Sequence, residues 1–526
     1  MLEHVPPIYT LCPVILYIAG LCVHRIYFHR LHQHPGPLLA KLTNWYAAYY
    51  TWQGTIHLKL REWHDAYGPI VRFGPNSISM NSPTAMAQIY SARANVRKDD
   101  AYSVMSASSH IPSTISCLDK GQHAAKRRIL AQLFTPSALK GVEERVLSHI
   151  RTFCASLGES SQDGRATDMA VLSDYLTFDI ISDLCYGQAF GLLQCTALRY
   201  IPNVISRISR RNAICFIQPA IQKYRLDRLF LAPISTQIRA FGRWIQQQQK
   251  EHPHKITPDF RSHLTTSTIT HSGPDPRPLT NKEVWIELLQ LVIAGSDTTA
   301  VALSAAVFHL CHHAAALARA TAEVRTHFPT TVEAIRPGSP QLRRCTYLHA
   351  CIHESLRLAP PVTGLAPRRV LEGGIQVDGV WLPAGIVLGC PIYAVQRDRT
   401  CFPAPDRYFP GRWEGVLDSS CKGEESDDMG EEERQQQRQK RSRMLSAFCP
   451  FSVGPRACVA RRFAMDEITV TLARALFLYD LRLAGRENAD TGTGAAGAAE
   501  YALKGWMTSG REGPVVYASP REGCSL

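Results

Sequence analysis

The sequence predicts a mainly α-helical fold with a minor β region, preceded by one membrane-spanning helix at the N-terminus. Three observations support this prediction. Apolar residues recur at helical spacing over most of the stretch from about residue 124 to residue 347. Short stretches rich in β-branched residues and bounded by glycine and proline occur at 68–80 and 373–389. With 526 residues, of which 45% are hydrophobic and 20% charged, the chain can bury a large core.

The first element is an apolar stretch over residues 5–23. Roughly 20 residues span a bilayer, so its length is just sufficient. A cleaved signal peptide is the alternative, but the start of the chain carries the acidic Glu3 instead of basic residues, and no small-residue cleavage site follows. The positive-inside rule places the rest of the chain in the cytosol because basic residues follow the stretch (Arg25, Arg30 and Lys41). We therefore predict a single-pass anchor over residues 1–29 and a folded domain over 30–526.

The next elements are a stiff connection, a hairpin and a long helix. Pro35-Gly36-Pro37 cannot continue a helix, and residues 68–80 alternate apolar and polar side chains, which predicts a β-hairpin. The strongest helix is expected from Asn281 to His313, because Thr280 and Glu283 have capping-box spacing in front of it. About 33 residues give a helix roughly 50 Å long. Its middle is apolar all round, so it should cross the buried interior.

Three further elements are predicted before the C-terminus. A helix should run from 341 to 358, where a double proline stops it, and short strands should follow between 373 and 389. Residues 414–447 are of low complexity, with a run of acids followed by a run of bases, and cannot bury enough apolar surface to order themselves. We therefore expect a surface insertion there, and a last helix after Cys458.

Charge and cysteine content restrict the partners and the compartment. The formal net charge of +13 favours an anionic partner. The chain has no zinc-finger spacing and no helix on which basic residues concentrate, so a membrane or an acidic protein is expected and nucleic acid is not. The 16 cysteines are too sparse for a disulfide scaffold, and most stand among apolar residues, as buried thiols of a reducing compartment do.

One cysteine has different surroundings. Cys458 lies in Phe451-Ser-Val-Gly-Pro-Arg-Ala-Cys-Val-Ala460, directly before the last predicted helix. A helix N-terminus and the nearby Arg456 would both lower the pKa of the thiol, and Gly454 allows a turn or a close backbone approach. A buried structural cysteine is the alternative, and the spacing alone leaves both open.

The pattern Phe-x-x-Gly-x-Arg-x-Cys followed by an apolar residue resembles the haem-binding loop of the cytochrome P450 family. The resemblance implies that Cys458 is the thiolate ligand of the iron of haem b, and that Arg456 contacts the haem. Ala460 departs from the pattern, because the family usually has glycine there. Three more motifs of the family stand elsewhere in the family's order.

The first of these motifs is Ala294-Gly-Ser-Asp-Thr-Thr299 on the long helix. A glycine inside a helix costs about 1 kcal/mol relative to alanine, and the Thr298 hydroxyl can bond back to the carbonyl of Ala294, which loosens that turn. Helix capping is the alternative, but it makes little sense midway through a helix. The resemblance implies that Asp297 and Thr298 are the catalytic acid–alcohol pair that delivers protons for oxygen activation.

The second motif is Glu354-Ser-Leu-Arg357, whose charged residues share one helix face. A solvated pair would contribute under about 1 kcal/mol, but the apolar neighbours favour burial, where breaking a network costs roughly 3–5 kcal/mol. The family takes a third member from Pro-Glu-Arg-Phe/Trp, here Pro410-Gly-Arg-Trp413, in which Gly411 replaces the usual glutamate. We expect a structural network of Glu354, Arg357 and Arg412.

The third motif is His123-Ala-Ala-Lys-Arg127, whose two ends lie one helical turn apart. Without further context, a basic helix face is most often solvated surface. The resemblance implies that His123 and Arg127 bind a haem propionate. Pro367-Arg368-Arg369 resembles a later propionate-binding element, and alignment on the glycines at 373–374 favours Arg368.

The resemblance extends from the proline hinge to the helix after Cys458. It implies the cytochrome P450 fold and a haem-thiolate monooxygenase that inserts one oxygen atom of O2 into an apolar small molecule. Two phrases resemble fungal members of secondary metabolism (Tyr67-Gly-Pro-Ile-Val-Arg72 and Phe178-Asp-Ile-Ile-Ser-Asp183). The substrate is not identified, and the pocket is expected at 105–115, around Val292 and at 362–365.

The same resemblance implies the electron supply and the location. Electrons should come from NADPH through a separate NADPH–cytochrome P450 reductase, because the chain has no nucleotide-binding motif. A basic chain suits an acidic partner of this kind. The expected location is the endoplasmic reticulum membrane, with the catalytic domain in the cytosol.

Two other classes of function compete with the monooxygenase. A haem-dependent isomerase or dehydratase would need no reductase, but such members often lose the acid–alcohol pair that Asp297 and Thr298 would form. A non-catalytic haem-binding sensor would have no use for a proton relay. Both residues therefore favour turnover with dioxygen.

Overall fold

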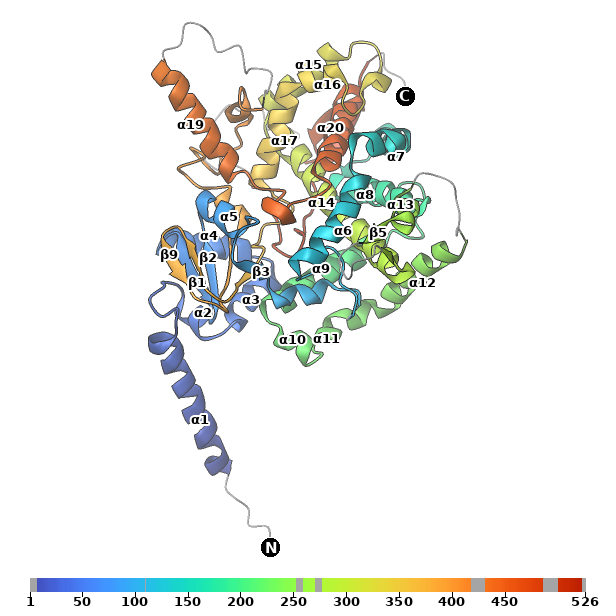
Figure 1. Ribbon diagram of the computed structural model, residues 1–526. Helices are drawn as coiled ribbons and strands as arrows, with labels where there is room; N and C mark the ends of the chain where they lie inside the picture. Colours follow the sequence, from blue (N-terminus) through green and yellow to red (C-terminus); the bar gives the residue numbers. More distant parts are fainter. Residues whose placement is uncertain are drawn as a thin grey trace.

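The computed structural model describes residues 7–108, 110–251, 259–269, 277–417, 431–485 and 500–522. Long helices form most of the domain and the main β-sheet lies to one side of them (Figure 1). The predicted class, mainly α with a minor β region, is confirmed.

The helices of the first half lie partly beside the main sheet and partly on the opposite side of the domain (Figure 1). Their bounds are α1 (Pro7–Val23), α2 (Leu38–Leu42), α3 (Trp45–Gln53), α4 (Ile56–Tyr67), α5 (Pro83–Ile89), α6 (Lys120–Leu133), α7 (Pro136–Gln162), α8 (Met169–Tyr186), α9 (Ile201–Ile217), α10 (Ala220–Lys223), α11 (Asp227–Leu231), α12 (Ser235–Glu251) and α13 (Phe260–Thr266). Short turns of other helical types are η1 (His24–Phe28), η2 (Asp100–Met105) and η3 (Ala232–Ile234).

The helices of the second half include the central helix of the core and the mostly exposed α19. Their bounds are α14 (Asn281–His312), α15 (Ala314–His327), α16 (Pro340–Arg344), α17 (Thr346–Leu358), α18 (Ile392–Val395), α19 (Glu431–Ala447) and α20 (Arg461–Leu478), with the short turns η4 (Val332–Ala334), η5 (Pro410–Trp413) and η7 (Gly454–Arg456).

The predicted long helix is confirmed as α14. Thr280 and Glu283 form the expected capping box at its start, and its centre is buried against α8. Gly295 lets the two helices pack closely, because a Cβ at this position would lie 3.1 Å from the side chain of Ile181 on α8.

The strands form one main sheet and three small ones. The main sheet has the order β1 (Ile70–Gly74), β2 (Ser77–Met80), β10 (Val387–Gly389), β7 (Arg368–Val370) and β3 (Val96–Lys98). The predicted hairpin at 68–80 is the antiparallel pair β1–β2, and the predicted strands at 373–389 are β8 (Ile375–Val377), β9 (Val380–Leu382) and β10. The remaining strands are β4 (Thr167–Asp168), β5 (Thr268–Ile269), β6 (Arg277–Pro278), β11 (Tyr479–Leu483) and β12 (Val515–Pro520).

The helix predicted over 341–358 is two helices. Cys345 separates α16 from α17. The break is stabilised because the carboxylate of Glu323 accepts the backbone N–H groups of Tyr347 and Leu348, both at 2.9 Å. Such a carboxylate satisfies donors that begin a new helix, as a capping side chain does.

The expectation that residues 414–447 do not order themselves is wrong for their second half. Residues 431–447 form α19, and Met444 and Ala447 near its C-terminal end are buried. Glutamate, glutamine, lysine and arginine are good helix formers, so one buried turn is enough to hold a helix that is otherwise exposed. Residues 418–430 of the insertion lie outside the described residues.

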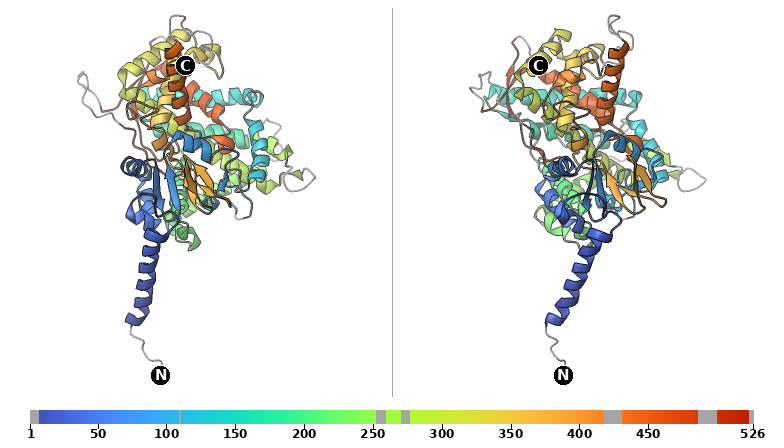
Figure 2. Two further views of the ribbon diagram at one scale, coloured as in Figure 1. Left: turned by 60° about the vertical axis from the view of Figure 1, so that its left-hand side comes forward. Right: turned by 90° about the vertical axis from the view of Figure 1, so that its left-hand side faces the viewer.

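The N-terminal helix α1 stands away from the domain in every view (Figures 1 and 2). Its apolar side chains from Val14 to Ile18 are 52–71% exposed. Among the described residues, α14 is the helix long and apolar enough to cross a membrane, and it is a core helix; the apolar stretch Cys12–Phe28 is shorter. The anchor therefore stays a prediction.

Candidate active site

The loop before α20 presents the Cys458 side chain through a glycine turn. The Cys458 N–H donates to the carbonyl of Phe451 at 2.9 Å. Gly454 has a φ of 75°, and a Cβ there would come within 1.9 Å of the carbonyl oxygen of Tyr90. Only glycine fits so close to another backbone segment in this conformation. The glycine of the motif therefore fixes where the cysteine lies.

Several groups around Cys458 act on its pKa in opposite directions. Burial raises the pKa of the thiol and has the largest influence, while the Ala460 N–H, which donates to sulfur, and the charges of Arg127 and Arg461 lower it. The net direction is upward. The Ala460 departure is tolerated because φ is −95° at this position, which any residue adopts.

Cys458 is exposed, whereas most cysteines of the domain core are buried. Burial is nevertheless the largest influence on the pKa of its thiol. A sulfur that faces an internal hollow would be both accessible to a small molecule and surrounded by protein. Ala294, Gly295 and Thr298 are partly exposed in the middle of the otherwise buried α14. An internal hollow between these two places would give a haem and a small ligand the room that they need.

A cluster of basic side chains lies beside the Cys458 loop. We call it the basic cluster, and its members are Lys98, His123, Arg127, Arg368 and Arg456. Burial, and then the charges of the other four members, lower the pKa of His123 to about 3. Within the described ranges, none of the five forms an ion pair with a carboxylate. The cluster therefore carries excess positive charge in a largely buried place, which fits the two propionates of a haem.

Backbone carbonyls hold the arginines of the basic cluster in place. Arg127 donates to Ala457 O at 2.6 Å, and Arg456 donates to Cys117 O at 2.7 Å. Arg368 donates to the carbonyls of Ala366 and Pro367, both at 3.1 Å. Neutral acceptors orient the guanidinium groups without cancelling their charge.

Lys98 is the member of the basic cluster that the sequence did not reveal. It is 7% exposed and pairs with Arg368 in the antiparallel register of β3 and β7. Its ammonium donates to Ile115 O and lies 4.2 Å from the centre of the Tyr102 ring. Burial, and then Arg456 and Arg368, lower the pKa of Lys98 well below its usual range.

The predicted acid–alcohol pair points in two directions. The Thr298 hydroxyl donates to Ala294 O at 2.8 Å, which confirms that expected hydrogen bond. The Asp297 carboxylate accepts from Arg511 Nη1 at 3.2 Å and from the side chain of Thr508. No contact described in the structure joins Asp297 to Thr298 directly, as expected for neighbours about 100° apart around a helix.

Asp297 belongs to a second group of buried charges that no sequence motif predicted. Arg511 also binds Asp174 on α8, so that one guanidinium lies between two carboxylates. We call these three residues the Asp297 cluster. Burial is the main cause that raises the pKa of both acids, Asp174 to about 6, and Arg511 opposes the increase.

The predicted structural network is confirmed. Glu354 accepts from Arg357 at 2.8 and 2.9 Å and from Arg412 at 2.9 Å, and both Glu354 and Arg357 are fully buried. Trp413 Nε1 and the Phe409 N–H donate to the same carboxylate at 2.9 and 3.0 Å. The network does not need the glutamate that Gly411 replaces.

Comparisons with known proteins agree over almost the whole chain. The family model described as Cytochrome P450 matches residues 35–495. The chain is 33% identical to cytochrome P450 monooxygenase atnE of Emericella nidulans, over 97% of this chain and 95% of the relative. It is 32% identical to cytochrome P450 monooxygenase AKT7 of Alternaria alternata, over 97% of each chain, and 33% identical to cytochrome P450 monooxygenase poxM of Penicillium oxalicum, over 95% and 92%.

Proposed function

The chain belongs to the cytochrome P450 family and is a monooxygenase, and we propose that it oxygenates an apolar small molecule of fungal secondary metabolism. The reaction consumes the substrate, O2, two electrons and two protons, and yields the oxygenated product and one water. The fungal relatives support this pathway class. The observation that carries the proposal is the exposed Cys458 thiol beside a largely buried basic cluster that has no carboxylate partner within the described parts of the chain.

The residues of the chain would hold a haem as follows. Cys458 is the proposed iron ligand, and the basic cluster would bind the propionates through charge-assisted hydrogen bonds. When bound, the haem supplies the chemistry that activates dioxygen. Iron coordination would deprotonate the thiol in spite of its raised pKa, with the Ala460 N–H donating to the sulfur.

Thr298 and Asp297 are the proposed proton carriers. The Thr298 hydroxyl uses its proton on Ala294 O, so its lone pairs are free to accept a hydrogen bond from a water in the hollow. Asp297 lies one residue earlier, with a raised pKa that suits a group that both takes up and releases protons. Together they would supply the protons that the reaction consumes.

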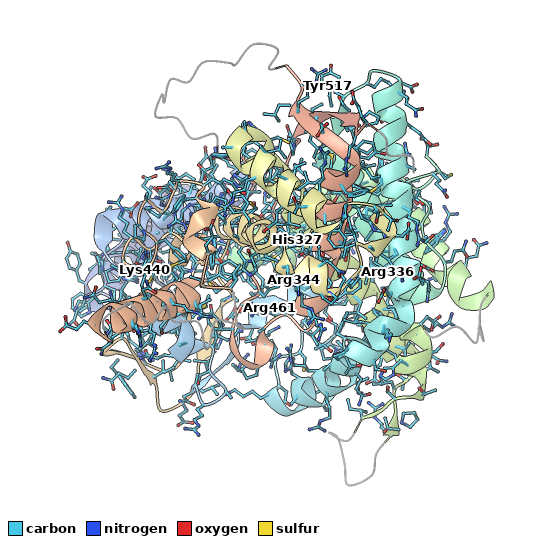
Figure 3. All side chains as sticks on the ribbon, turned by 90° about the horizontal axis from the view of Figure 1, so that it is seen from above. His327, Arg336, Arg344, Lys440, Arg461 and Tyr517 are labelled. Carbon is cyan, nitrogen blue, oxygen red and sulfur yellow. The ribbon has the colours of Figure 1, made fainter. Side chains whose placement is uncertain are left out.

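The face opposite α1 suits an acidic reductase (Figure 3). Lys440 on α19, Arg461 on α20 and Arg344 on α16 are exposed on this face. Arg461 is only three residues beyond Cys458, so a reductase bound there would deliver electrons close to the thiolate. Charge complementarity of this kind mainly raises the rate of association and its salt dependence.

We also propose that α1 anchors the enzyme in the endoplasmic reticulum membrane with the domain in the cytosol. Its apolar side chains are exposed, and it extends away from the domain as one isolated helix (Figure 2). A cavity of about 250 Å3 at the base of this helix is lined by Arg25, Phe73, Phe216 and Leu365, among others. It would let an apolar substrate enter from the membrane side.

The proposal is tested with microsomes that contain the enzyme, the reductase and NADPH. We expect an oxygenated product from at least one member of a panel of terpenoids, polyketides and aromatic compounds. No product from any of them, in spite of full haem loading, would contradict the proposal. A product that forms without NADPH would instead indicate an isomerase or a dehydratase.

The ligand assignment has its own test. Cys458→Ser should lose the strongly red-shifted Soret band of the reduced carbon monoxide complex, because that shift requires a thiolate ligand. Cys195→Ser, at an exposed cysteine away from the site, is the matched control and should keep the band. An unchanged spectrum in Cys458→Ser would overturn the assignment.

A further inference from the structure

The C-terminal segment forms a tight hairpin over residues 504–510 that leads directly to Arg511. Lys504 and Gly510 exchange backbone hydrogen bonds of 2.7 and 2.9 Å. The Gly505 N–H also donates to Gly54 O at 2.6 Å, which fixes the hairpin against the start of the domain. These three bonds fix the backbone shape of the hairpin and one of its points of attachment.

Helix α9 is tied to this hairpin at two neighbouring residues. The Thr508 N–H donates to Ser209 Oγ at 3.0 Å, and the Ser209 hydroxyl can donate to Thr508 O at 3.3 Å. Arg210 places its guanidinium 5.3 Å from the centre of the Trp506 ring. Ser209 is 8% exposed, so water does not readily replace these bonds.

Helix α9 also borders the region where we expect the substrate pocket. It packs against η2, which leads into the segment 105–115. Ile214 and Val104 belong to one buried apolar cluster, and Arg211 donates to Val104 O at 3.2 Å. A rearrangement of the residues that close the pocket would therefore displace α9.

The other end of the hairpin holds Asp297. The Thr508 side chain and Arg511 Nη1 are its two hydrogen-bond donors. Arg511 is shared with Asp174, and its Nε donates to Ser304 Oγ at 3.2 Å. Because two carboxylates share one guanidinium, Asp297 is held mainly by Arg511, which directly follows the hairpin, and the Thr508 hydroxyl is a further donor to it.

We propose that Thr508 and Arg511 are positioning residues for proton delivery, and that the 504–510 hairpin couples Asp297 to helix α9. The coupling rests on the proposed function of Asp297 as a proton carrier. When α9 is closed, Ser209 holds the hairpin so that Thr508 reaches the Asp297 carboxylate. When α9 moves away, the hydrogen bonds from its Ser209 to the hairpin break, and Thr508 is no longer held against the Asp297 carboxylate. Asp297 therefore supplies protons only while the pocket is closed. This lowers the share of electrons lost to peroxide, in which NADPH, H+ and O2 give NADP+ and H2O2.

Amide hydrogen exchange of the haem-loaded, full-length enzyme tests the coupling without substrate or turnover. Coupling between two sites is reciprocal, so Asp297→Asn should speed exchange in α9 by roughly tenfold, the loss of one hydrogen bond to a charged group. In a Ser209→Ala background the same change should have no further effect on α9. Equal α9 exchange in Asp297→Asn and the wild type would overturn the coupling.

Peroxide yield gives the second readout, in microsomes with NADPH and reductase. Ser209→Ala and Thr508→Val should each raise the peroxide released per NADPH by at least about threefold, and should shift the pH profile of coupling. Lys504→Gln is the control on the same hairpin, since the ammonium that it removes pairs with Glu512 at the surface.

The two proposals fail in different ways. If Ser209→Ala and Thr508→Val match the wild type while Asp297→Asn loses product, the hairpin coupling is wrong and the relay stands. If Asp297→Asn keeps full product formation, the relay is wrong, whatever the exchange data show.

Discussion

The basic cluster and the Asp297 cluster are both buried groups of charge, and they are unbalanced in opposite directions. The basic cluster has no carboxylate partner among the described residues, whereas the Asp297 cluster has two carboxylates and one guanidinium. The Glu354 network, by contrast, fully satisfies its carboxylate with five donors. Buried charge that the protein leaves unbalanced is expensive, so we infer that each excess serves a ligand: propionates in one cluster and a proton in the other.

The Glu354 network, whose carboxylate is fully hydrogen-bonded, is the reference for the two clusters, and a change in it should lower the free energy of unfolding most. Glu354→Gln should lower the free energy of unfolding of the domain by roughly 3–5 kcal/mol, because it leaves two buried guanidinium groups without their carboxylate. Glu414→Gln is the control, since Glu414 pairs with Arg319 at the surface, and under about 1 kcal/mol is expected. Urea unfolding of both variants measures the difference. Equal losses would show that burial does not distinguish these pairs.

Removing one charge from the basic cluster should act in opposite directions on the two forms of the protein. Lys98→Met should stabilise the haem-free protein, because it relieves repulsion by Arg456 and Arg368. It should speed haem loss from the loaded protein by roughly tenfold or more, because one charge-assisted hydrogen bond is lost. Thermal unfolding of the apoprotein and haem transfer to apomyoglobin measure the two effects. Destabilisation of both forms would mean that the charge is merely structural.

The acids of the Asp297 cluster have raised pKa values, so the cluster should contribute less to the free energy of unfolding as the pH rises. The native pKa of Asp174 is about 6 and lies above its ordinary value of 3.8, so the native state binds more protons than the unfolded state between these values. This contribution to stability is therefore fully present below about pH 4 and is lost as the pH rises through about 6. Unfolding curves from pH 4 to 7 should lose this component in Asp174→Asn. If Asp174 instead made the protein more stable as the pH rises from 4 to 7, the inferred excess of acid in the Asp297 cluster would be contradicted.

Thr298→Ala should have the smallest effect on stability and a clear effect on the reaction. The variant loses one hydrogen bond to Ala294 O, worth about 0.5–1.5 kcal/mol, and should keep its haem. Reducing equivalents should go to peroxide instead of product, because the hydroxyl no longer holds a proton carrier in the hollow. Peroxide and product per NADPH are measured together, with Thr299→Ala as the control, since Thr299 is buried and bonds back to Gly295 O. Full coupling in Thr298→Ala would exclude the relay.

The two clusters also differ in how much of them the sequence could predict. Four members of the basic cluster stand in local motifs, where residues one turn or one short loop apart must lie together. Lys98 could not be predicted, because it joins the cluster through the pairing of β3 with β7. The partners of Asp297 are 214 residues away for Arg511 and lie on a separate helix for Asp174, so only tertiary packing brings them together.

The same distinction holds for the fold. The capping box of α14 and the hairpin β1–β2 follow from neighbouring residues and were predicted. The break at Cys345 depends on Glu323 from another helix, and the order in α19 depends on burial of its last turn. Both depend on contacts that hydrophobic periodicity and composition do not contain.

The central claim is that the excess positive charge of the basic cluster binds the haem propionates. The most direct measurement compares the affinity of the apoprotein for haem with its affinity for haem dimethyl ester, in which both propionates are neutral. We predict that the wild type binds the ester at least roughly a hundredfold more weakly, the value of two charge-assisted hydrogen bonds, and that Lys98→Met reduces this ratio. Equal affinities for the two porphyrins in the wild type would contradict the claim.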